Sequence, residues 1–146
     1  MNEQSFFQLT QDAVTSLAER YGTPLLVLSL EQVEKNYDIL REHIPQLKIH
    51  YAMKANPDLH ILDLLINKGA CFDVASDGEI RTRSQLGVSG DRMIYANPIK
   101  LDAGVQACRD AGVYRMTYDS ESEIKKIAEH CPGATVLLRL RIDNAK

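Results

Sequence analysis

The sequence lacks several features that would assign it to a special class of protein. None of its apolar runs approaches the roughly 20 residues that span a bilayer, and the first twelve residues have no basic region followed by an apolar core, as a secretory signal would. The net charge of -3 gives no reason to expect nucleic acid or an anionic membrane as a partner. With 45% hydrophobic residues, the 146-residue chain has an ordinary globular composition, and we expect it in the cytoplasm.

Cysteine is also scarce and not patterned. Cys71, Cys108 and Cys131 are odd in number and form no CxxC pair. We therefore predict neither a disulfide framework nor a metal site, and interpret the three thiols as small buried hydrophobic groups in a reducing compartment.

What the chain does have is a regular alternation of strand and helix patterns. Apolar runs predict strands over Lys48–Ala55, Cys71–Ser76, Met93–Pro98, Arg115–Asp119 and Thr135–Asp143. Their centres, at residues 52, 74, 95, 117 and 138, lie 21 or 22 residues apart, and each gap holds a segment with helical periodicity. The stripe is weakest between Ile80 and Leu86. Such alternation favours parallel strands joined by crossover helices.

Local signals support the predicted helices. Ser29 with Gln32, and Ser120 with Glu123, form capping-box patterns at two helix starts. Glycines at positions 69, 87 and 112 follow three helical segments, where a left-handed cap favours this residue.

Two architectures fit this alternation, an open doubly wound sheet and a (β/α)8 barrel. No GxGxxG follows the first strand, which disfavours a dinucleotide-binding sheet. A barrel of eight strands typically needs about 250 residues, so the chain would hold about five of them. It also stops just after its most apolar strand, with no helix to cover it, and we therefore expect a fragment of a longer α/β protein.

The first thirty residues fall outside this rhythm. A helical stripe that includes Val14 and Leu17 leads to Gly22 and then to a strand-like run, Leu25–Leu30. We predict that residues 1–30 belong to a second substructure and that residues 31–146 form the partial barrel.

Side-chain alternation places charged residues inside the predicted barrel. Lys54 stands at the C-terminal end of one strand face, and Asp73, Arg139 and Arg141 occupy matching faces of two other strands. Active sites of such barrels lie at the C-terminal ends of the strands. These patterns leave two interpretations open. Lys54 could have a structural place, in a buried ion pair or reaching solvent at the strand end, or it could be a desolvated lysine beside arginine that acts as a nucleophile.

Specific motifs favour the second interpretation. The run Tyr51–Asn56 (YAMKAN) resembles the cofactor-lysine motif of the alanine-racemase-like group of pyridoxal phosphate enzymes. Further stretches match one branch of that group in order: FDVAS with Asp73, Glu79, YANP with Lys100, YDS with Glu123, and LLR with Arg139. Together they resemble the ornithine decarboxylases and the bacterial lysine/ornithine decarboxylases, over nearly the whole chain from about Tyr21.

Related branches match less well. Alanine racemases resemble KANAYGHG after the lysine, whereas Lys54 is followed by ANPDL. Diaminopimelate decarboxylases resemble DVVSGGE and FHGNGK, where this chain has DVASDGE and YANPIK. A diaminopimelate or carboxynorspermidine-type decarboxylase stays an alternative, as does a non-catalytic regulatory homologue that acts by binding a partner protein.

The resemblance implies a fold, a reaction and a site. It implies a homodimer whose subunits have a pyridoxal-phosphate-binding barrel and a β-rich domain, to which residues 1–30 contribute. The enzyme would decarboxylate L-ornithine or L-lysine to a diamine in polyamine biosynthesis. The resemblance also implies that Lys54 holds the cofactor covalently, that Asp73 and Glu79 are acidic residues of the site, and that Arg139 lies beside the cofactor. The family's stacking histidine, phosphate-binding glycines, pyridine-binding acid and product-protonating cysteine would lie beyond Lys146. We therefore expect this chain alone to be inactive.

Overall fold

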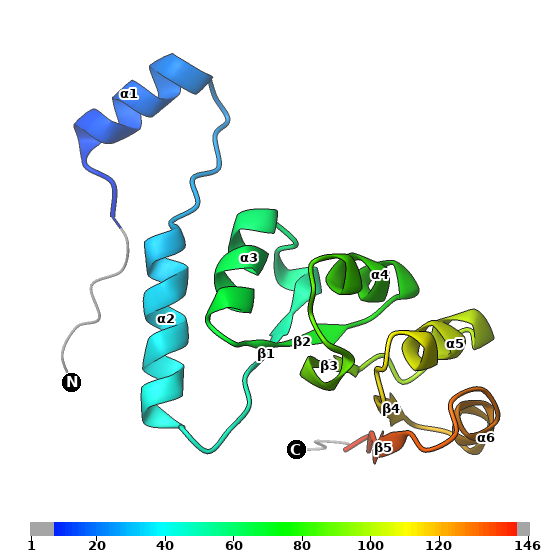
Figure 1. Cartoon of the computed structure of the whole chain (residues 1–146). Coiled ribbons are helices and arrows are strands. Elements are labelled where there is room, and N and C mark those ends of the chain that lie inside the picture. The colour runs from blue at the N-terminus through cyan, green and yellow to red at the C-terminus, as the bar shows by residue number, and fades with distance from the viewer. Residues whose placement is uncertain (1–7, 143–146) are drawn as a thin grey trace. The chain divides into compact units, whose positions relative to one another are not determined.

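The computed structural model describes residues 8–142. The chain divides into two compact units, residues 1–46 and 47–146, and each is described here by itself (Figure 1). The predicted domain boundary after residue 30 stays a prediction.

The first unit contains two helices, α1 (Gln11–Tyr21) and α2 (Leu30–His43). Ser29 caps α2 as predicted, because its hydroxyl accepts a hydrogen bond from the backbone N–H of Gln32 at 3.1 Å. Gly22 ends α1 at a φ of 81°.

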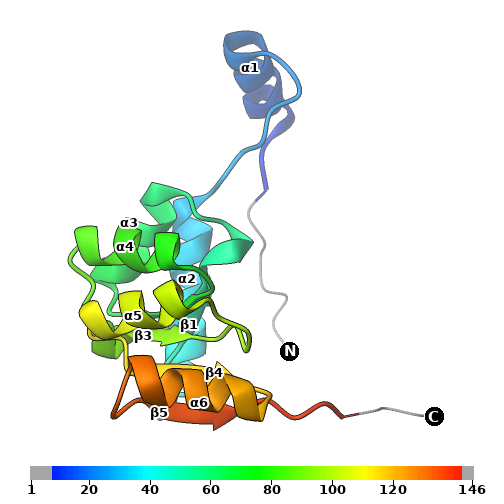
Figure 2. The same cartoon turned by 90° about the vertical axis from the view of Figure 1, so that its right-hand side faces the viewer.

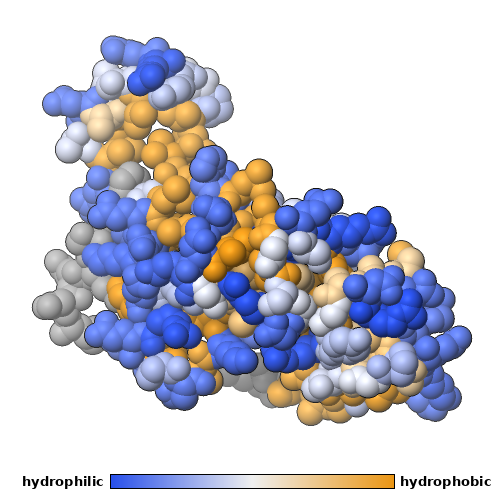
Figure 3. All heavy atoms as spheres, in the orientation of Figure 1, coloured by the Kyte–Doolittle hydropathy of each residue, from blue (hydrophilic) through white to orange (hydrophobic). Residues whose placement is uncertain are grey.

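The prediction of a strand-like segment over Leu25–Leu30 is wrong. Leu30 begins α2, and the preceding residues form neither helix nor strand. A strand needs a neighbour for its backbone N–H and C=O groups, and none of the described residues pairs with this segment. Its side chains are exposed, up to 91% at Leu26, and Figure 3 shows hydrophobic residues gathered where the segment joins α1 to α2.

The second unit confirms the predicted α/β alternation. One parallel sheet has the order β1-β2-β3-β4-β5, so strands that follow each other along the chain are neighbours. The strands are β1 (His50–Ala52), β2 (Cys71–Val74), β3 (Met93–Tyr95), β4 (Arg115–Tyr118) and β5 (Thr135–Leu138). The connecting helices are α3 (Leu59–Asn67), α4 (Asp77–Gln85), α5 (Asp102–Asp110) and α6 (Glu121–His130), with short 3-10 turns η1 (Met53–Ala55) and η2 (Gly90–Arg92).

The four helices cover one face of this sheet. Right-handed crossovers between neighbouring parallel strands place every connecting helix on the same side, as in the wall of a barrel (Figures 1 and 2). The core lies between the helices and this face, where Phe72 and Val74 of β2 are fully buried, as the alternation predicts. Burial of each such side chain contributes about 1.5–3 kcal/mol.

The strands are shorter than predicted. β1 ends at Ala52, opposite Asp73 of β2, and the chain then turns into η1, so Lys54 lies on a 3-10 turn rather than on the strand itself. β5 ends at Leu138 because β4, its only neighbour among the described residues, turns away after Tyr118 to begin α6. The predicted last residue of this strand, Asp143, lies outside the described residues.

Candidate functional site

A pocket of about 220 Å³ opens at the C-terminal ends of the strands. It lies where active sites of (β/α)8 barrels lie. Its lining comes from η1, β2, α4, the loop after β3 and the residue after β5, namely Lys54, Asp73, Ala75, Glu79, Ala96, Asn97, Pro98 and Arg139. All four residues predicted from the sequence as a site are therefore brought together.

Lys54 and Asp73 stand on adjacent strand ends. Burial raises the pKa of Asp73, and the negative charge of Glu79 adds to this, while the positive charge of Lys54 opposes it. The raised pKa means that this carboxyl group holds its proton more readily than an exposed aspartate does.

Glu79 has a structural task as well as a place in the pocket. Its carboxylate accepts a hydrogen bond from the backbone N–H of Ala75 at 2.6 Å, and its own N–H donates to the hydroxyl of Ser76 at 3.2 Å. These two bonds close the turn between β2 and α4, and a carboxylate in a first helical turn is stabilised by the helix dipole. Glu79 thus fixes the position of Ala75 in the pocket wall.

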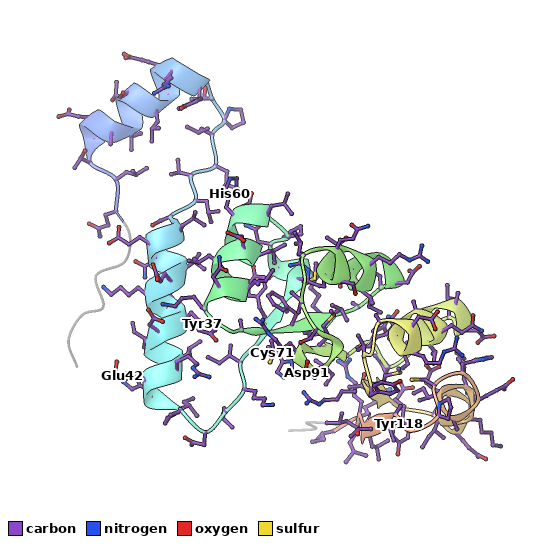
Figure 4. The ribbon with its side chains drawn as sticks, in the orientation of Figure 1. Tyr37, Glu42, His60, Cys71, Asp91 and Tyr118 are labelled. Carbon is purple, nitrogen blue, oxygen red and sulfur yellow. The ribbon has the colours of Figure 1, made fainter. Side chains whose placement is uncertain are left out.

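Arg139 enters from the far edge of the sheet. It follows β5 directly, and its backbone N–H donates to the carbonyl of Tyr118 at 2.8 Å, where Figure 4 labels Tyr118 at the end of β4. This bond aligns its backbone with the end of β4, and its side chain lines the pocket. Arg141, the second predicted interior arginine, is not among the residues that line the pocket.

Sequence reasoning assigned no role to the small and polar residues of the lining. Asn97 and Pro98 belong to the YANP motif, which carries part of the family resemblance. Ala75 and Ala96 leave open space beside the charged groups. Their position directly after two strands could have indicated a place in the pocket, because the loops that follow the strands of a barrel form its active site.

The lining suits pyridoxal phosphate. The cofactor needs a lysine amine for its covalent bond, a fixed cation for its phenolate oxygen, and room for a flat ring. Lys54, Arg139 and the two alanines provide these features within one pocket. In residues 8–142 no group of histidine, cysteine, aspartate and glutamate side chains could hold a metal ion, and no helix is long and apolar enough to cross a membrane.

Comparison with known proteins supports this interpretation. Residues 30–146 match the family model of the pyridoxal-dependent decarboxylase, pyridoxal binding domain. The chain is 49% identical over 140 residues to a lysine/ornithine decarboxylase of Selenomonas ruminantium, covering 96% of this chain and 36% of that protein. It is also 36% identical over 115 residues to antizyme inhibitor 2 of Xenopus laevis, covering 75% of this chain and 25% of that protein.

Solved structures agree with the sequence matches. The crystal structure of SrLDC in complex with PLP and cadaverine superposes with a TM-score of 0.89 at 48% identity, covering 97% of this chain and 37% of that one. The chain thus spans about a third of the length of the relatives it matches. It belongs to the pyridoxal-dependent decarboxylases, and residues 30–146 correspond to their pyridoxal-binding domain.

Proposed function

We propose that these residues are part of a decarboxylase that uses pyridoxal phosphate to remove the α-carboxylate of L-lysine or L-ornithine. The observation that carries this proposal is the pocket, which gathers a lysine, a carboxyl group and an arginine at the site end of a barrel wall. The similarity to a lysine/ornithine decarboxylase supports a basic amino acid as the proposed substrate.

In this proposal Lys54 holds the cofactor through its side-chain amine. Because η1 follows β1 directly, the backbone of the lysine is anchored at a strand end, and its exposed side chain lines the pocket where it would hold the cofactor. Held by Lys54 and Arg139, pyridoxal phosphate would supply the electron sink that decarboxylation of an amino acid needs.

The other charged residues orient the site. Arg139 offers a guanidinium that stays charged at all physiological pH values, and this suits the phenolate oxygen of the cofactor. Asp73 lines the same pocket as Lys54, and its carboxyl group interacts electrostatically with the lysine ammonium. Glu79 holds the turn that carries Ala75 and adds negative charge next to Asp73.

Completion of the site belongs to the rest of the protein. Leu137, Leu138 and Leu140 are 45%, 54% and 70% exposed around the edge strand β5, and we infer that further barrel strands cover them. We also propose a cytoplasmic homodimer as the working form, and an inactive, poorly folded product when residues 1–146 are expressed alone. A cooperative melt and turnover by residues 1–146 would contradict this last point.

A substrate panel tests the proposal. The whole protein is incubated with pyridoxal phosphate and, separately, L-lysine, L-ornithine, L-arginine and meso-diaminopimelate, and carbon dioxide release is measured. Release from lysine or ornithine is expected, and Lys54→Ala should abolish it. Lys48→Ala is the matched control, because Lys48 is an exposed lysine that does not line the pocket. Activity on meso-diaminopimelate alone would contradict the proposed substrate class.

A further inference from the structure

A buried ion pair lies behind one wall of the pocket. The ammonium of Lys100 and a carboxylate oxygen of Glu123 are 2.9 Å apart, and the two side chains are 0% and 5% exposed. A lysine is rarely buried to this degree, because removal of its charge from water costs several kcal/mol unless partners replace the water.

The ammonium of Lys100 has such partners on three separate segments. It donates to the backbone carbonyls of Thr117 at 2.6 Å and Asn97 at 3.1 Å, with that of Pro98 at 3.4 Å. Glu123 on α6 supplies the counter-charge. Lys100 therefore ties the loop after β3 to strand β4 and to the start of α6.

Glu123 extends this network. It accepts a second hydrogen bond from the backbone N–H of Lys100 at 3.1 Å, and its other oxygen lies 2.9 Å from the ammonium of Lys126, which also donates to the carbonyl of Lys100. Burial by itself would raise the pKa of Glu123, but the bonds from the two lysines outweigh it and the pKa is lowered. The carboxylate is thus charged when the loop is in place.

The loop held by this network is the pocket wall. Asn97 and Pro98 line the same pocket as Lys54 and Arg139, while their carbonyls are bonded to the ammonium of Lys100. The side-chain oxygen of Asn97 accepts from the backbone N–H of Ile99 at 3.2 Å, which fixes the loop locally. A well-packed apolar pair could stabilise this region equally well, so a buried ionic network is better explained by the specific geometry that it imposes.

We propose that Lys100 is a positioning residue of the cofactor pocket: its ammonium, neutralised by Glu123, holds the Asn97–Pro98 wall at the distance from Lys54 that cofactor and substrate need. The inference rests on the proposed function, since it concerns the same pocket. Lys100 itself is not among the residues that line the pocket.

The first test substitutes the lysine in the whole protein. Lys100→Met removes the donor but keeps a long apolar side chain. We expect the dissociation constant for pyridoxal phosphate to rise, and kcat/KM to fall, by about tenfold or more, because a displacement of about 1 Å in a supporting residue can cost on the order of 100-fold. The matched control is Lys125→Met, which removes an equal charge from a 74% exposed lysine of α6 and should change both constants by less than about twofold.

A second pair of variants separates positioning from stability. Lys100→Met alone leaves Glu123 buried without its main counter-charge, which lowers stability whatever else Lys100 does. The double variant Lys100→Met/Glu123→Gln removes both charges and should regain thermal stability. It should still bind the cofactor about tenfold more weakly, because the carbonyls of Asn97 and Pro98 have lost their bonds to the ammonium. Glu123→Gln alone should lose stability, but the ammonium of Lys100 keeps its bonds to the carbonyls of the loop and of β4, and the amide oxygen of the new side chain can still accept from it. Cofactor affinity should therefore stay within about twofold.

The outcomes are distinct. Recovery of both stability and affinity in the double variant would show that Lys100 is only half of a structural ion pair and would overturn the inference. If the double variant does not fold, Glu123→Gln decides: affinity within about twofold supports the inference, and a tenfold loss overturns it. A wild-type protein that takes up no pyridoxal phosphate would instead overturn the proposed function, together with the inference that rests on it.

Discussion

Arg83 offers a direct test of the energetics of this fold. It has the largest of the fully buried side chains among the described residues, and it lies on the face of α4 that packs against the sheet. Its guanidinium is 5.3 Å from the centre of the Phe72 ring, and none of its three nitrogens has a hydrogen-bond partner among the described residues. Burial lowers the pKa of this guanidinium, against the opposing charge of Glu79.

The magnitude follows from these contacts. An unsatisfied buried charged group costs about 3 kcal/mol or more, and the cation–π contact with Phe72 returns about 0.5–2 kcal/mol. Methionine fills a similar volume and makes its own favourable contact with an aromatic ring, of about 0.3–1.5 kcal/mol. Arg83→Met should therefore raise the free energy of unfolding by about 2 kcal/mol, which corresponds to roughly 4–8 °C in Tm for a domain of about 150–250 residues.

Thermal unfolding of the whole protein, followed by circular dichroism, measures this change. Arg81→Met is the matched control on the same helix, because Arg81 is 70% exposed and its ion pair with Asp77, at 3.4 Å, is a surface pair that contributes about 0–1 kcal/mol. An unchanged or lowered Tm in Arg83→Met would refute the reasoning.

Two further changes test packing and charge. Gly90→Ala should cost about 3 kcal/mol, because a Cβ atom there would lie 2.2 Å from the carbonyl group of Gly112, whereas Gly78→Ala, with no atom nearer than 3.9 Å, should be neutral or stabilising by up to about 1 kcal/mol in denaturant titrations. Although burial alone would raise it, the pKa of Glu123 is lowered by its lysine partners, so its contribution to stability is present above its ordinary value of 4.5 and is lost as the pH falls through the lowered value. Glu123→Gln should therefore flatten the acid limb of a curve of stability against pH, and an unchanged limb would contradict this.

The strand and helix order was predictable because its signals are local. Helical stripes and capping serines act within a few residues, and Ser120 does cap α6 by accepting from the N–H of Glu123 at 3.4 Å. The pocket residues came together for a topological reason, since parallel strands present their C-terminal ends at one edge. Knowledge of the strand positions was therefore enough to bring Lys54, Asp73 and Arg139 together.

Features that depend on distant partners were not predictable. An apolar run such as Leu25–Leu30 indicates a strand only if a neighbouring strand exists to pair with it. The burial of Lys100 depends on its ion pair with Glu123, which is 23 residues away along the chain. The helical periodicity of hydrophobic residues is weak in α4 because Arg83, a charged residue, occupies one of its buried positions.

Lys54 is the residue that we propose to hold pyridoxal phosphate. The most direct measurement treats the cofactor-loaded whole protein with borohydride, which fixes the bond between cofactor and lysine, and then identifies the modified peptide by mass spectrometry. We predict a phosphopyridoxyl group on Lys54 and none in Lys54→Ala. The same group on any other lysine of the wild-type protein, or on none, would contradict the account.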